Sequence, residues 1–263
     1  MKKRILSILL LCCMVLTLLP TTVLAADGPM DTIPKYDVSI DVYNRTSDIS
    51  IKDSRSYYIY SSVPDKLRDT WAWDKKIFIK GDKTAPHVFI DGVNIKMSPS
   101  SKGPAIELNK KASAYLYFIG KDSTLQGADG RAAIQKNRSE GQLYVLARTG
   151  TTVTCKGGYR AAGIGGSWAI RNIGDSMFNM DMYGHGVNMH FGSQSNPDYW
   201  GGTINATGGE YGAGIGAGSW GHSGYSGNTI HGGAGERLYF YSGTVNASGG
   251  RDIDMAAASL KAS

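Results

Sequence analysis

The residues best suited to chemistry in this sequence are aromatic. Trp168 and Trp220 each follow a Gly-Ile-Gly segment in two near-copies of one repeat, and Tyr199-Trp200 precedes the second copy. Trp and Tyr rings present flat apolar faces that stack on sugar rings, while neighbouring amides and carboxylates bind hydroxyls. The alternative is that the rings pack over the ends of the fold. Trp168, Tyr199, Trp200 and Trp220 are therefore our candidate carbohydrate-binding residues.

Acidic residues make a weaker case for catalysis. Polysaccharide-degrading β-helix hydrolases use clustered Asp residues and a Gly-His-Gly, and Gly184-His185-Gly186 is present, but the second half of the chain has no Asp-Asp pair. Catalysis would require carboxylates within about 6–10 Å of one another in a groove. The side chains that would have to converge are Asp181, His185, Asp198 and Glu210, and Asp252 with Asp254 could hold Ca²⁺. We assign no catalytic residue and leave the enzyme question open.

Metal and cofactor motifs are missing from the sequence. The five histidines show no His-x-His or His-Glu-x-x-His spacing. Gly163–Gly166 lacks the Gly-Lys-Ser/Thr ending of a phosphate-binding loop. Cys155 occupies a repeat position held by Ala206 and Ala247, which predicts a small packed side chain rather than a nucleophile. We predict no metal and no cofactor.

The N-terminus indicates export. Met1 to Arg4 is basic, Ile5 to Leu19 is apolar, and Val23-Leu24-Ala25 suits a signal-peptide cleavage site. We therefore expect a signal peptide over 1–25, a polar leader over 26–36 and one β-rich domain over 37–263. The expected location is extracellular, with attachment to the cell surface left open.

Charge argues against a nucleic-acid partner. The chain carries a formal net charge of +6, and loss of Lys2, Lys3 and Arg4 with the signal leaves +6 − 3 = +3. No dense basic run remains. After the signal there is no second apolar stretch long enough to span a membrane. Cys155 is then the single cysteine, so no disulfide forms within the chain.

Short alternating segments predict strands almost throughout. Val38–Val42, Ile77–Ile79 and Ala114–Ile119 alternate with period two between turn residues. Helical periodicity is nearly absent; the candidates are a Pro-led stretch at Val63–Trp73 and an Ala-rich one at Met255–Lys261.

Repeats and glycine define the second half. The chain has 35 Gly, of which 27 lie in residues 150–263. Thr152–Gly158 matches Thr203–Gly209 and Thr244–Gly250. In shorter similar segments, the isoleucines at 106, 134 and 164 are separated by steps of 28 and 30 residues. Such spacing favours an all-β solenoid, a single-stranded right-handed parallel β-helix, in which Gly-Gly pairs turn the corners with positive φ. A β-sandwich with Asp-Gly hairpins at Asp91-Gly92 and Asp129-Gly130 is the alternative.

Residues 77–220 resemble bacterial secreted proteins described as carbohydrate-binding-domain-containing or Gly-rich right-handed β-helix surface proteins. The resemblance lies in Phe89–Ile95, Gly103–Leu108 and the two Gly-Gly…Ala-Gly-Ile-Gly units. It implies a parallel β-helix at a bacterial surface and a glycan or a host-surface polysaccharide as partner. The third unit departs from it, because Arg251-Asp252-Ile253-Asp254 follows its Gly-Gly.

The hypothesis favoured by these observations is a non-catalytic, secreted or surface-exposed binding module, carbohydrate-binding or adhesin-like. The alternatives are a polysaccharide-degrading β-helix hydrolase or lyase and a purely structural surface stalk. Convergent charged side chains in a groove would favour the enzyme, and exposed aromatic rings on one face would favour the binding module.

Overall fold

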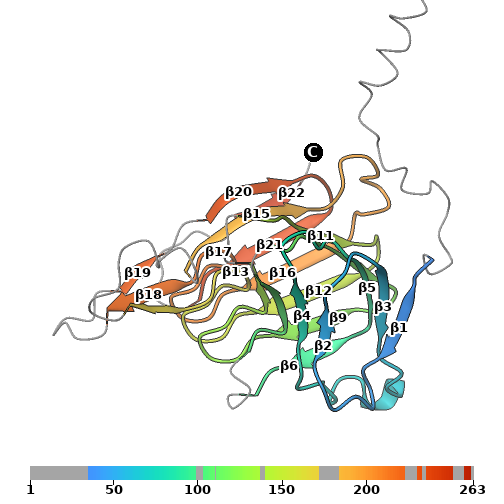
Figure 1. Ribbon diagram of the computed structural model, residues 1–263. Helices are drawn as coiled ribbons and strands as arrows, with labels where there is room; N and C mark the ends of the chain where they lie inside the picture. The colour runs from blue at the N-terminus through green and yellow to red at the C-terminus, as the bar shows by residue number, and fades with distance from the viewer. Residues whose placement is uncertain are drawn as a thin grey trace, which may run out of the picture. The chain divides into compact units, whose positions relative to one another are not determined.

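A computed structural model describes residues 35–98, 103–109, 111–136, 140–171, 184–222, 230–232, 235–250 and 258–261. The regular secondary structure of these residues consists almost entirely of short β-strands (Figure 1). The expected helix at Val63–Trp73 is limited to one 3₁₀ turn, η1 (Asp65–Leu67), which Pro64 precedes.

The strands form three parallel sheets and one small mixed sheet. Sheet A contains, in order, β1 (Val38–Asp41), β3 (Ser56–Tyr60), β5 (His87–Asp91), β8 (Ala114–Ile119), β11 (Leu143–Ala147), β15 (Gly186–Phe191) and β20 (Gly235–Phe240). Sheet B contains β2 (Ile49–Ile51), β4 (Ile77–Lys80), β7 (Ile106–Asn109), β10 (Ile134–Gln135), β13 (Ile164–Gly165) and β17 (Ile215–Gly216).

Sheet C and sheet D complete the list. Sheet C contains β6 (Asn94–Lys96), β9 (Ser123–Gln126), β12 (Thr152–Lys156), β16 (Thr203–Thr207), β21 (Thr244–Ser248) and β22 (Ala258–Lys261). Sheet D contains β14 (Ala169–Arg171), β18 (Ser219–His222) and β19 (Ile230–Gly232). Among the described strands, only the β18–β19 and β21–β22 pairs are antiparallel.

The chain alternates between sheets A and B in its first two circuits, from β1 to β4. From β5 to β17 it visits sheets A, C and B in turn, so that each of these circuits adds one strand to each sheet. Each strand therefore pairs with the strand one circuit before it and the strand one circuit after it, as the stacked arrows in Figure 1 show. This is the all-β, parallel architecture of a solenoid. Parallel pairing across three sheets excludes the sandwich alternative. Gly92 and Gly130, both with positive φ, turn the chain from sheet A to sheet C and from sheet C to sheet B, not in hairpins.

Isoleucines fill the same place in successive circuits. The register of sheet B aligns Ile49, Ile77, Ile106, Ile134, Ile164 and Ile215. All of these except Ile215 are buried. The expected steps between repeats are confirmed, because each step carries the chain once around the interior.

Large side chains of sheet A fill the interior space that small side chains of sheet C leave. In sheet C, the inward row runs from Ile95 and Leu125 to Cys155, Ala206 and Ala247. In the circuits of Ala206 and Ala247, sheet A contributes Phe191 and Phe240, whose stacked rings lie 5.1 Å apart. The prediction for Cys155 is confirmed: its side chain is fully buried, and burial raises the pKa of its thiol.

The Gly-Gly pairs serve close packing rather than positive φ. A Cβ on Gly209 would overlap the carbonyl oxygen of Gly158 in the preceding circuit. Positive φ falls instead on the non-glycine residues Arg160 (61°) and Tyr211 (60°). The sequence prediction was right that these repeats need glycine, but it assigned the wrong physical reason.

The expected C-terminal helix is wrong for its described part. Residues 258–261 form β22, which pairs antiparallel with β21. A seven-residue Ala-rich segment is too short to be a stable isolated helix, whereas a strand satisfies backbone groups at the exposed edge of sheet C.

We expect Gly209→Ala to destabilise the protein more than Gly150→Ala. Gly150 has a φ of +85° but nothing within 4 Å of an added Cβ, so its replacement carries only the strain of positive φ, about 1–2 kcal/mol. Gly209 has no positive φ, but its replacement by Ala must force two circuits apart. Urea unfolding of both variants measures the difference; equal losses of unfolding free energy would contradict the close-packing explanation.

Candidate functional site

A continuous stack of aromatic rings lies on the outer face of sheet A. The register aligns His87, Tyr115, Tyr144, His190 and Tyr239, one from each of five successive strands. Alternation along each strand places these side chains opposite the inward row, as in β8, where Ala114 and Leu116 are buried and Tyr115 is half-buried. We call these five residues the outer ring row.

The rings of this row stack face to face. Ring centroids are 4.7 Å apart between His87 and Tyr115, 4.4 Å between Tyr115 and Tyr144, 4.4 Å between Tyr144 and His190, and 4.7 Å between His190 and Tyr239. The planes are within 17° of parallel. The spacing follows the distance between neighbouring strands, about 4.8 Å. Ring faces inside the row are thus covered by one another, and the outward edges carry the hydroxyl and imidazole groups.

Tyr239 ends the described row, because β20 is the last strand of sheet A. Its side chain is 43% exposed, whereas His190 beneath it is 9% exposed. Only one of its ring faces lies against His190. The row therefore offers half-buried edges at His87, Tyr115 and Tyr144 and an exposed ring at Tyr239.

Two histidines share one arrangement with tyrosines of the next circuit. His87 stacks on Tyr115, and its Nδ1 lies 2.9 Å from the Tyr117 hydroxyl. His190 stacks on Tyr239, and its Nδ1 lies 3.0 Å from the Tyr241 hydroxyl. Burial lowers the pKa of both histidines and raises the pKa of Tyr117 and Tyr241. All four groups are therefore held neutral near pH 7.

The predicted residues Tyr199 and Trp200 lie over this same face. Trp200 is buried, with its ring 5.1 Å from that of Tyr117, and Tyr199 packs edge-on against Trp200 at 4.7 Å. Together with Tyr58, Phe89, Ile119 and Leu146, Trp200 forms a second apolar cluster outside the sheet. Trp200 thus covers the sheet, and Tyr199, which is half-buried, forms the outer side of that cover.

Trp168 lies elsewhere, at a corner between circuits. Its backbone N–H donates to the Gly130 carbonyl at 2.9 Å, and its ring carbon Cε3 lies 3.2 Å from the place where a Cβ on Gly130 would be. The Arg160 guanidinium is 5.3 Å from the Trp168 ring, 4.9 Å from Tyr159 and 5.7 Å from Tyr211. We call Tyr159, Arg160, Trp168 and Tyr211 the arginine corner.

Trp220 is not the partner of Trp168 in the sheet. The β14–β18 register pairs Trp220 with Ala169, and Ser219 takes the place of Trp168 by donating its N–H to the Arg160 carbonyl at 3.0 Å. One extra residue after Ile215, in Gly216-Ala217-Gly218, shifts the second copy by one position. The two tryptophans therefore do not form one row, and the carbohydrate role of all four residues stays a prediction.

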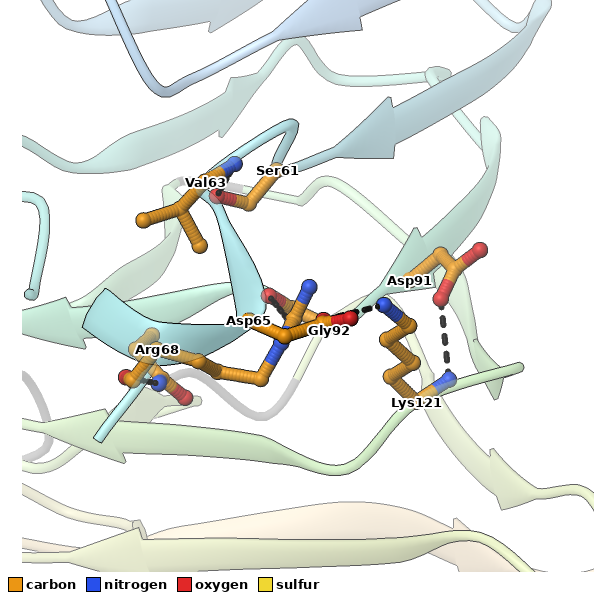
Figure 2. A network of polar contacts seen from close by, with 8 residues as sticks. Ser61, Val63, Asp65, Arg68, Asp91, Gly92 and Lys121 are labelled. Atoms are coloured by element: carbon orange, nitrogen blue, oxygen red, sulfur yellow. Dashed lines mark hydrogen bonds and ion pairs between the residues drawn. The ribbon is translucent and has the colours of Figure 1, made fainter.

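A polar network fastens η1 to neighbouring circuits (Figure 2). Arg68 Nη1 donates to the Gly92 carbonyl at 3.0 Å, and Lys121 Nζ lies 2.8 Å from Asp65 Oδ1. The Lys121 backbone N–H donates to Asp91 Oδ1 at 2.9 Å, and the Tyr58 hydroxyl donates to Asp91 Oδ2 at 2.9 Å. These four contacts all join two parts of the fold, so this network has a structural role.

The residues considered for catalysis are only partly described. Asp181, Asp252 and Asp254 lie outside the described residues. Asp198 and Glu210 are exposed and His185 is half-buried. Within the described ranges, no group of three His, Cys, Asp or Glu side chains is placed to hold a metal ion. No described helix is long and apolar enough to cross a membrane.

Comparison with known proteins identifies no relative: no family model, no curated protein and no solved structure matches the chain. The site must therefore be interpreted from its own geometry. The outer ring row was not among the residues predicted from sequence. Its signal was the spacing of His87, Tyr115 and Tyr144 at 28 and 29 residues, the same step as the isoleucines.

We expect the free energy of unfolding to fall as the pH drops below about 6.5. Burial depresses the pKa of His87 and His190 in the folded protein, whereas unfolded histidines take up protons near their ordinary pKa of 6.5. The unfolded state then binds more protons, which favours unfolding. Urea titrations between pH 8 and 5 measure this slope. The double variant His87→Gln/His190→Gln should reduce it, and an unchanged slope would contradict the assignment.

Proposed function

We propose that this protein is a secreted, non-catalytic carbohydrate-binding module built on a right-handed parallel β-helix. The right-handed path is proposed because connections between parallel strands of one sheet are right-handed in nearly all proteins. Export follows from the signal-like residues 1–25. The observation that carries the binding proposal is the outer ring row, five stacked rings on the outer face of sheet A.

The geometry of the row suits an extended polymer. A polysaccharide lying along the row would meet the half-buried edges of His87, Tyr115 and Tyr144, with one sugar ring stacked on the exposed Tyr239. Polar edges provide direction and hydrogen bonds, and the terminal ring provides apolar contact. The Trp200 cluster beside the row supports the proposal, because it holds the sheet rigid and so fixes the ring spacing in advance.

Glycan-array binding of the purified protein tests this function. We expect binding to an extended polysaccharide and at least a tenfold loss of affinity in Tyr239→Ala. Tyr144→Phe, which keeps the ring and removes one hydroxyl, should cause a smaller loss, about 0.5–1.5 kcal/mol for one neutral hydrogen bond.

Tyr36→Ala is the matched control. Tyr36 is 39% exposed and stacks on one ring, that of Tyr58, yet it is not part of the row. Its replacement should leave affinity unchanged. Absence of glycan binding, or equal effects of Tyr239→Ala and Tyr36→Ala, would refute the proposed site.

A further inference from the structure

We propose that the arginine corner is a second ligand site, one that binds the carboxylate of an acidic sugar residue, such as a uronic acid in a polysaccharide. The inference rests on the proposed carbohydrate-binding function and names a substrate class for it. It starts from hydrogen-bond donors that the fold leaves unpaired.

Unpaired buried donors gather at this corner. Among the described residues, the buried side-chain nitrogens without a hydrogen-bond partner are Arg68 Nε, Arg160 Nε and Trp168 Nε1, and two of these three belong to the corner. Arg68 Nε has a carboxylate nearby, since it lies 3.6 Å from Asp65 Oδ1. Arg160 makes no ion pair with any carboxylate of the described chain. The N–H groups at Arg160 Nε and Trp168 Nε1 thus lack a hydrogen-bond acceptor, and no carboxylate of the described chain pairs with the permanent charge of Arg160.

The backbone at Arg160 has a positive φ of 61°, which is strained for a residue other than glycine. Gly130, Arg160 and Tyr211 occupy the same corner in three successive circuits, all with positive φ. Backbone hydrogen bonds hold the register: the Arg160 N–H donates to the Glu210 carbonyl at 2.8 Å, and the Gly130 N–H donates to the Tyr159 carbonyl at 2.9 Å. Glycine adopts this conformation without steric cost, as it does at Gly130. Keeping Arg and Tyr at such positions is characteristic of functional sites.

The aromatic rings around Arg160 indicate that the ligand carries an apolar face beside its negative charge. Tyr159, Trp168 and Tyr211 surround the guanidinium, and Tyr159 is 39% exposed. Because Arg160 Nε and Trp168 Nε1 are buried, the proposed binding requires the exposed Tyr159 ring to turn outward. An arginine fork pairs with a carboxylate through two parallel hydrogen bonds, and aromatic walls accept the apolar face of a sugar ring. A carboxylated sugar supplies both features in one residue.

Calorimetric titration of the purified protein with a uronic-acid oligosaccharide tests the site. The matched ligand is the same oligosaccharide with its carboxylates reduced to alcohols. We expect the acidic form to bind at least tenfold more tightly, with affinity falling as salt rises. Trp168→Phe keeps the ring, removes the indole N–H, and should weaken binding several-fold.

Arg160→Gly is the decisive variant, because glycine suits the positive φ and the variant should fold at least as stably as the parent protein. We expect it to bind the acidic and reduced oligosaccharides equally weakly at this site. Unchanged preference for the acidic form in Arg160→Gly would overturn the proposal. Displacement of the sugar by inorganic phosphate at equal concentration would also overturn it, because any small anion would then suffice.

The two proposals fail in different ways. Binding of neutral glycans that depends on Tyr239, with no preference for carboxylates, would overturn the arginine corner and leave the outer ring row intact. Absence of binding to every glycan would overturn both.

Discussion

The parallel hydrogen bonding between successive circuits is the constraint on which the rest of this structure depends. Each circuit must lie within strand-pairing distance of the next in sheets A, B and C at once. Side chains therefore stack directly on their equivalents, inside and outside. The isoleucines of sheet B form one row for this reason, and the places where Gly158 and Gly209 meet admit no Cβ. The glycine excess of the second half is thus a consequence of backbone contact between circuits.

The same constraint organises the surface. In the outer ring row on sheet A, each ring centroid lies 4.4–4.7 Å from its equivalent in the next circuit, so aromatic residues there must stack. In such a stack, neighbouring rings cover each other's faces, and the hydroxyl and imidazole edges point outward. At the corners, where the chain leaves one sheet for the next, this stacking is interrupted. The arginine corner can therefore carry a charge and unpaired donors that a regular sheet face would pair.

Prediction from sequence succeeded where a pattern was local or repeated without change. The alternating strands, the Ile106–Ile134–Ile164 step and the buried Cys155 follow directly from repeat position and are confirmed. It failed where one residue changes the register. Trp168 and Trp220 look equivalent by motif, but a single added residue pairs Trp220 with Ala169. The terminal Ala-rich segment failed for another reason, because the open edge of β21 outweighs helix propensity.

By itself, the sequence determined that the fold is all-β, and its recurring step of about 30 residues favoured stacked parallel strands over a sandwich. The parallel pairing of the strands decided between the two. The sequence also determined which residues are small, aromatic or charged. Only the tertiary structure decided which of these meet. His87, Tyr115, Tyr144, His190 and Tyr239 become one row, and Arg160 comes to lie among three rings, because insertions of different length between strands leave the hydrogen-bonded register intact while they change the spacing in the sequence.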